Sequence, residues 1–209
     1  MAHDLDDVRK HSEDPAAFKI SMAMHFLEKI PKRMPESDIG RMALEANIDS
    51  FLFFASSVID VIKREINDEF GLFDKENVFY IHGIRKHLSD SGKQKKVKKI
   101  ISHYFTTPSK KNEVWDKKQS GLWRLQILRN KVTHGHILKS RSNTLSITYA
   151  VAQYRKNGDL SFSFDESVKN PHAYFAQIFE DLSGFVKKTR MVIPPKHKKS
   201  TLQSRMKKS

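Results

Sequence analysis

The residues best suited to chemistry in this sequence are Arg129, Asn130 and His134, within the stretch LRNKVTHG at 128–135. A histidine can act as general base and general acid near neutral pH. An arginine stays charged and can hold two phosphoryl oxygens at once. The amide of Asn130 can donate a hydrogen bond to a phosphate or orient the imidazole. Because RNA carries its own nucleophile, the 2′-hydroxyl, such a set could cleave RNA without a metal ion.

The same stretch also has the features of an ordinary helix end. Basic side chains in a last helical turn interact favourably with the negative end of the helix dipole, and Gly135 suits a left-handed cap. On a regular helix, five residues correspond to about 140° of rotation and about 7.5 Å of rise, so Arg129 and His134 would not converge. A catalytic site therefore requires that the helix ends at His134, that a second copy completes the site across a two-fold axis, or both.

Composition points to a polyanionic partner. The 209 residues include 38 Lys or Arg and 24 Asp or Glu, a formal net charge of +14, which favours nucleic acid. The absence of cysteine excludes disulfide scaffolds, thiolate zinc sites and cysteine nucleophiles. We find no glycine pattern of the Walker A or GxGxxG kind. No apolar run approaches the roughly 20 residues that span a bilayer, and the N-terminus is acidic, so we expect a cytoplasmic protein without a membrane partner.

The hydrophobic pattern predicts a mainly α protein. Amphipathic periods indicate six helices, over 15–30, 40–69, 77–89, 93–101 with an aromatic end at Tyr104 and Phe105, 113–134, and 171–192. In the first helix the expected apolar stripe has a spacing of four, with further apolar residues beside it: Phe18, Met22, Phe26 and Ile30, flanked by Ile20, Met24 and Leu27. The second helix is interrupted by polar residues, for which we expect structural hydrogen bonds, with lining of a polar cleft as the second interpretation: Asn47, Asp49, Ser50, Ser56, Ser57 and Asp60.

A β-hairpin is predicted at about 144–164, inserted before the last long helix. Two segments alternate with period two, and Asn157-Gly158-Asp159 between them is a tight-turn signal. A lone hairpin is only marginally stable, so it must pack on the helices. The resulting organisation is an N-terminal helical extension over 1–39, a helical domain over 40–192, and a basic, disordered tail over 193–209.

Several basic residues are candidates for contact with RNA. Five lysines fall within 93–99 without a carboxylate among them, so we expect no local salt bridges there. The segment is either an ordinary solvated helix face or a surface that contacts phosphate. The candidate RNA-binding residues are Lys95, Lys96, Lys98, Lys99, Lys131 and His136. His134 and His136 could also bind a metal ion, but two ligands do not make a site, and we predict no metal and no cofactor.

The stretch RNKVTH at 129–134 resembles the Arg-x4–6-His motif of HEPN domains (higher eukaryote and prokaryote nucleotide-binding), in which the residue after the arginine is typically polar, as Asn130 is. The resemblance covers about 40–192. Residues 45–60 are also similar to HEPN subgroups with a hairpin before the last helix. One departure is that some relatives carry a basic residue where this chain has Ser56 and Ser57.

The HEPN resemblance implies a helical bundle that is usually dimeric, with two motifs facing each other across a cleft. Many members are metal-independent ribonucleases acting as toxins or antiviral effectors, which would make Arg129 and His134 catalytic and Asn130 supporting. The spacing from Arg129 to His136 also fits the motif; we prefer His134, and the sequence leaves both open. Other members are inactive and serve as binding or dimerisation modules.

We therefore expect a homodimeric, metal-independent endoribonuclease of toxin or antiviral defence type, with a composite site and with RNA as its partner. An inhibitor or a partner protein of the defence system is a further expected partner. The alternative is a non-catalytic HEPN-type module that binds RNA or a protein. A DNA-binding regulator is a third hypothesis, but no recognition-helix signature supports it.

Overall fold

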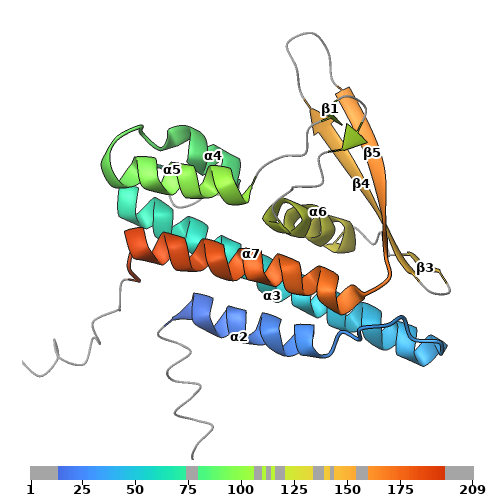
Figure 1. Cartoon of the computed structure of the whole chain (residues 1–209). Helices are drawn as coiled ribbons and strands as arrows, with labels where there is room; N and C mark the ends of the chain where they lie inside the picture. Colours follow the sequence, from blue (N-terminus) through green and yellow to red (C-terminus); the bar gives the residue numbers. More distant parts are fainter. Residues whose placement is uncertain are drawn as a thin grey trace, which may run out of the picture.

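The computed structural model describes residues 14–73, 80–105, 110–111, 114–115, 121–133, 139–141, 144–153 and 160–195. The described helices are α2 (Pro15–Glu28), α3 (Asp38–Phe70), α4 (Ile81–His87), α5 (Gly92–Tyr104), α6 (Gly121–Thr133) and α7 (Pro171–Val192). The strands are β1 (Lys110–Lys111), β2 (Val114–Trp115), β3 (Lys139–Arg141), β4 (Thr144–Gln153) and β5 (Leu160–Val168). The prediction of a mainly α protein with a hairpin before the last helix is confirmed (Figure 1).

Local signals fix the ends of the longest helices. The side chains of Asp14, Ser37 and Asn170 accept hydrogen bonds from the first free backbone N–H groups of α2, α3 and α7. Gly71 ends α3 in the left-handed region, at a φ of +60°. Capping residues are local signals, and the boundaries predicted from the sequence for these three helices lie within two residues of the observed ones.

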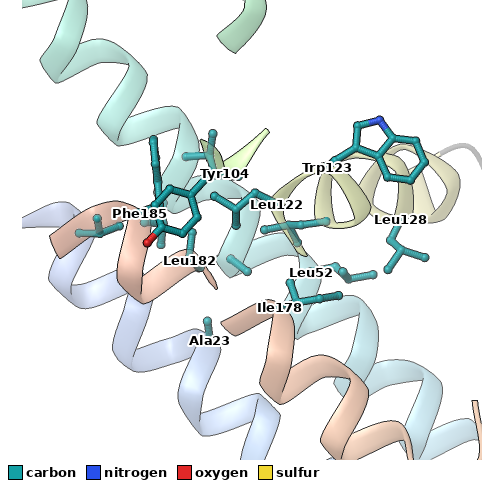
Figure 2. Packing of buried hydrophobic residues seen from close by; sticks show 14 of the residues in the cluster. Ala23, Leu52, Tyr104, Leu122, Trp123, Leu128, Ile178, Leu182 and Phe185 are labelled. Carbon is teal, nitrogen blue, oxygen red and sulfur yellow. The ribbon is translucent and has the colours of Figure 1, made fainter. Parts of the chain in front are cut away.

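Helix α3 is the central element of the bundle. It packs against α2, α6 and α7, which lie around it in Figure 1. Its inward face is fully buried, and the Phe51 ring meets the Phe175 ring of α7 edge-on, with 5.5 Å between the centroids. In Figure 2, Leu128 of α6 points toward Leu52 of α3, with Ile178 of α7 close by. A single core therefore joins α3 to α2, α6 and α7.

Helix α3 is also long and apolar enough, by length and composition, to cross a membrane. The expectation that no segment has this property therefore does not hold for α3. A core helix meets the same criterion, and α3 buries eleven side chains in the bundle.

The predicted core stripe of α2 is wrong in its rotation. The residues of α2 and of the turn after it that are buried are Ala16, Ala23, Leu27 and Ile30. Of the predicted stripe, Ile30 is buried as expected, whereas Phe18 is 39% exposed and Met22 and Phe26 are only partly buried. Small side chains at Ala16 and Ala23 allow the backbones to approach closely, so the larger residues flank the contact with α3. Through this contact α2, within the predicted extension 1–39, shares the core of the domain.

The helix predicted over 113–134 is shorter than expected. Val114–Trp115 pair with Lys110–Lys111 as a short antiparallel ladder, and α6 is described from Gly121. The reason lies in another helix: the Asp181 carboxylate of α7 accepts a hydrogen bond from the Gly121 N–H at the start of α6. A Cβ at Gly121 would lie 2.9 Å from the Ile178 Cα. Tertiary contacts therefore set this boundary.

The sheet is larger than the predicted hairpin. Strands β4 and β5 pair antiparallel from Leu145↔Val168 to Gln153↔Leu160, and β3 adds a third strand that pairs with β4. The turn predicted at 157–159 lies outside the described residues. Leu145, Ile147 and Val168 are buried in the helical core. The base of the hairpin is therefore held by the bundle, as the hairpin's marginal stability requires.

Candidate functional site

Helix α6 carries the candidate catalytic arginine. Leu122, Leu125 and Leu128 recur every three residues and are fully buried, which fixes the rotation of the helix on α3 and α7. The next two side chains, Arg129 and Asn130, are exposed. The Arg129 Nη1 donates to the Asn130 Oδ1 at 3.5 Å, a weak hydrogen bond. The predicted arginine and amide thus lie together on the surface near the end of α6.

The other candidates near this helix end are only partly described. Helix α6 is described to Thr133, and His134 and His136 lie outside the described residues, as does the side chain of Lys131. The convergence of Arg129 with either histidine therefore stays a prediction.

Helix α5 presents a basic surface. Val97, Ile101 and Tyr104 are buried, so the opposite face points outward. On that face Lys95, Lys96 and Lys99 are exposed and form no ion pair with any residue that the structure describes. We call these three residues the α5 lysines.

Two lysines of the 93–99 segment nevertheless form ion pairs with carboxylates from outside the segment. Lys98 pairs with Asp90 at 3.0 Å, and Lys93 pairs with Glu69 at 3.6 Å. Asp90 comes from the preceding turn and Glu69 from the end of α3, so neither partner is within the segment. Lys98, which is only partly exposed, is therefore a weaker candidate for phosphate contact than the α5 lysines.

The basic surface continues onto α7. The Lys188 Nζ lies 5.0 Å from the centroid of the Tyr104 ring, at the end of α5. Tyr104 in turn packs edge-on against Phe185. Lys187 and Lys188 are exposed. No pattern in the sequence marks these two residues, because a pair of lysines in the last turns of a helix is common.

A polar cluster at the base of the hairpin holds α6 in place. The Arg124 Nη2 donates to the Glu166 Oε1 at 2.8 Å, and the Tyr174 hydroxyl donates to the Glu166 Oε2 at 3.0 Å. The Arg124 guanidinium also lies 5.7 Å from the Tyr174 ring centroid. The cluster joins α6, β5 and α7, and no short-range pattern in the sequence reveals it.

A second cluster fastens the start of α2. The Arg190 Nη2 of α7 donates to Asp14 at 2.9 Å and to Glu65 of α3 at 3.0 Å. Burial raises the pKa of the Glu65 carboxyl, while Arg190 acts in the opposite direction. This cluster is a structural tie between three helices.

The polar residues of α3 mostly have the structural role that we expected. Ser50, Ser56 and Ser57 donate to backbone carbonyls three or four residues earlier in the helix. Asn47 reaches the Lys29 carbonyl at 3.4 Å, and Asp60 pairs with Lys63 at 2.6 Å. Burial raises the pKa of Asp49, which lies on the outer face of the helix.

Within the described ranges, no three His, Asp or Glu side chains gather in a way that could hold a metal ion. The pair His134 and His136 lies outside those ranges. Comparisons of the chain with protein-family models, with curated proteins and with solved structures find no match.

Proposed function

We propose that this protein is a metal-independent endoribonuclease of HEPN type that acts in the cytoplasm as a toxin or antiviral defence effector. The observation that carries the proposal is the exposed pair of Arg129 and Asn130 near the end of α6, five and four residues before His134 in the sequence. The helical bundle with a hairpin before α7 fits the architecture that the motif's resemblance implies. The net charge of +14 supports RNA as the substrate.

In the proposed reaction, the 2′-hydroxyl oxygen attacks the adjacent phosphorus as its proton passes to a general base. The bond from phosphorus to the 5′-oxygen breaks, and that oxygen takes a proton from a general acid. The products are a 2′,3′-cyclic phosphate and a 5′-hydroxyl. His134 serves in proton transfer, with His136 as the second candidate. Arg129 stabilises charge on the phosphoryl oxygens, and Asn130 orients the imidazole or the phosphate.

The α5 lysines would guide RNA toward this site. Helix α6 starts beside the last part of α5 and ends near the base of the sheet (Figure 1). Arg129 lies eight residues after Gly121, or about 12 Å along the helix axis. An RNA strand that contacts both surfaces must therefore run along α6. The remaining candidates, Lys131 and His136, come after Arg129 in the sequence.

The direct test is RNA cleavage in the presence of EDTA. We expect cyclic-phosphate products from the unaltered protein and at least about a hundredfold loss of rate in Arg129→Ala and His134→Ala. Arg64→Ala, which removes an exposed arginine of α3, is the matched control and should cleave normally. A parallel His136→Ala variant decides between the two histidines. Unchanged cleavage in Arg129→Ala would refute the proposal.

The alternative function is a non-catalytic module that binds RNA or a protein partner. The observation that favours it is the exposure of the α5 lysines, since phosphate contact by lysines requires no histidine. Salt-sensitive RNA binding that is indifferent to His134→Ala, without cleavage, would select this alternative.

For the proposed toxin role, induced expression should arrest growth, and Arg129→Ala should abolish the arrest. Competition between RNA and duplex DNA tests the hypothesis of a DNA-binding regulator.

A further inference from the structure

The three-stranded sheet of β3, β4 and β5 has two faces of different composition. Positions alternate between the faces along a strand, and directly paired positions share a face, so the register assigns each position to one side. Leu145, Ile147 and Val168 fall on one side and are buried in the helical core. The other side, which we call the outer face of the sheet, is therefore turned away from the core.

Basic and hydroxyl-bearing residues share the end of the sheet that is nearest the bundle. On the outer face, Lys139 is paired with Ser146, which is paired in turn with Ser167. Arg141 is paired with Thr144 at the same end. Together with the residue that follows the last position of β5, they form a cluster that we call the basic end of the sheet: Lys139, Arg141, Thr144, Ser146, Ser167 and Lys169.

The basic end of the sheet has an excess of positive charge and is accessible where its burial is described. Ser167 and Lys169 are exposed, and Ser146 is half-buried. Glu166 belongs to the core side, where its carboxylate accepts a hydrogen bond from Arg124. On the outer face, the paired positions that the register describes include a single carboxylate, Asp165, against the three basic residues of the cluster.

Composition indicates which class of partner fits the outer face. Apart from Asp165, its paired positions on β4 and β5 are all Ser, Thr or Ala. A protein interface needs large apolar or aromatic anchors, and a platform for stacked bases needs aromatic rings. These positions supply neither. Lys, Arg, Ser and Thr are instead the groups that contact the phosphates and sugars of a nucleic acid. The outer face therefore fits a sugar-phosphate backbone.

The basic end of the sheet lies close to the candidate catalytic arginine. Helix α6 ends near the base of the sheet (Figure 1). Its last residue, Thr133, precedes Lys139 by six residues, and an extended chain of that length reaches at most about 21 Å. The α5 lysines lie toward the other end of α6. An RNA strand that runs along α6 from α5 therefore passes Arg129 and then reaches the basic end of the sheet.

We propose that the basic end of the sheet binds the sugar-phosphate backbone of RNA without regard to base sequence, on the side of Arg129 away from α5. The inference rests on the proposed function in taking RNA as the polyanion, but it concerns binding and requires no cleavage. With the α5 lysines on one side and this surface on the other, the substrate is an RNA that extends in both directions from the bond that is cleaved.

RNA binding by a chain that carries His134→Ala tests the surface, because it separates binding from cleavage. The added double change Lys139→Gln and Arg141→Gln should weaken binding to single-stranded RNA at least about tenfold and lower the slope of log K against log salt by about 1.4, or about 0.7 for each lost contact. The loss should be the same for RNAs of different base sequence. The control, Lys29→Gln with Lys32→Gln, changes the net charge equally and should retain the affinity and the slope. The measurement is fluorescence anisotropy at several salt concentrations.

A carboxylate introduced on the outer face provides a second test. Ser167→Glu should weaken RNA binding at least about tenfold by repelling phosphate. Ser21→Glu, the same change at an exposed position of α2, should leave the affinity unchanged. Urea denaturation checks that each variant is folded.

The outcomes separate this surface from the ribonuclease activity. Equal affinities of the two double variants, or a loss restricted to one RNA sequence, would overturn the proposal even if Arg129-dependent cleavage is observed. A specific loss of binding at the basic end in a protein that cleaves no RNA would support the surface and refute only the activity. Unchanged RNA binding together with a protein partner that Ser167→Glu releases would assign the outer face to that protein and overturn the proposal.

Discussion

Arg124 of α6 and Glu166 of β5 are joined by a hydrogen-bonded ion pair at 2.8 Å, although 42 residues separate them in the sequence. Both side chains are largely buried. The other Glu166 oxygen accepts the Tyr174 hydroxyl, so one carboxylate links the candidate catalytic helix to the sheet and to α7. The position of Arg129, five residues after Arg124, depends on this link.

Removal of the carboxylate should therefore destabilise the protein. Glu166→Ala leaves the Arg124 guanidinium buried without its partner and leaves the Tyr174 hydroxyl without an acceptor. We expect the free energy of unfolding to fall by about 2 to 4 kcal/mol, measured by urea denaturation. Lys98→Ala, which breaks the exposed pair with Asp90, is the control and should cost less than about 1 kcal/mol. A loss of similar size in both variants would contradict the assigned role of Glu166.

Gly184 of α7 allows close packing of the Tyr104 side chain. A Cβ at Gly184 would lie 2.5 Å from the Tyr104 Oη. Tyr104 is buried against Phe185 and has little room to shift. We expect Gly184→Ala to lower the free energy of unfolding by about 1 to 3 kcal/mol. Tyr104→Phe in the same chain should restore part of the loss, because it removes the clashing oxygen.

The control for this steric argument is Gly83 of α4. A Cβ at Gly83 would meet no heavy atom within 4 Å, and the residue lies inside a helix. Gly83→Ala should therefore be neutral or stabilise by up to about 1 kcal/mol. If Gly184→Ala is equally harmless, the contact with Tyr104 is looser than the structure indicates.

The sequence predicted those features that depend on neighbouring residues. The helices predicted over 40–69 and 171–192 from the amphipathic period lie within two residues of α3 and α7, whose first turns are capped by Ser37 and Asn170. The alternation in the hairpin region correctly predicted β4 and the first part of β5.

Features that depend on distant partners were not predictable in this way. The start of α6 depends on Asp181, which is 60 residues away, and the rotation of α2 depends on how closely α3 can approach Ala16 and Ala23. For the candidate site, the exposure of Arg129 could be inferred from the leucine stripe. Its relation to His134 could not, because helical geometry alone does not bring the two side chains together.

The pH dependence of stability should include a contribution from His82. Burial lowers the pKa of this imidazole, and Arg85 and Lys86 lower it further. At a pH below the ordinary imidazole pKa of about 6.5, the unfolded chain therefore binds more protons than the folded protein. The free energy of unfolding decreases as the pH falls from about 6.5 to the lowered pKa of His82.

His82→Gln should remove this contribution. As the pH falls from 7.5 toward the lowered pKa of His82, the free energy of unfolding of the variant should therefore decrease less than that of the unaltered protein. The measurement is urea denaturation at a series of pH values. Identical curves for the unaltered protein and His82→Gln would refute the prediction.

RNA binding should depend on the α5 lysines more than on total charge. Conversion of Lys95, Lys96 and Lys99 together to Gln should weaken binding to a single-stranded RNA and reduce the slope of log K against log salt by up to about 2, since each lost phosphate contact contributes about 0.7. The measurement is fluorescence anisotropy at several salt concentrations.

The matched control for the α5 lysines carries the same change in net charge on α2 and the turn after it: Lys19, Lys29 and Lys32 to Gln. This variant should retain most of the affinity and the salt slope. Equal weakening in the two triple variants would show that RNA responds to net charge alone and that α5 is not a binding surface.

A composite active site would show itself by complementation between two inactive chains. Arg129→Ala and His134→Ala protomers each lack one group of the proposed site. If Arg129 of one subunit acts with His134 of its partner, random mixing forms hybrid dimers with one intact site, and about a quarter of the unaltered activity should return. Two Arg129→Ala preparations mixed together should remain inactive. If the first mixture also stays at the level of its components, both groups act within one chain, and the site depends instead on the helix ending at His134.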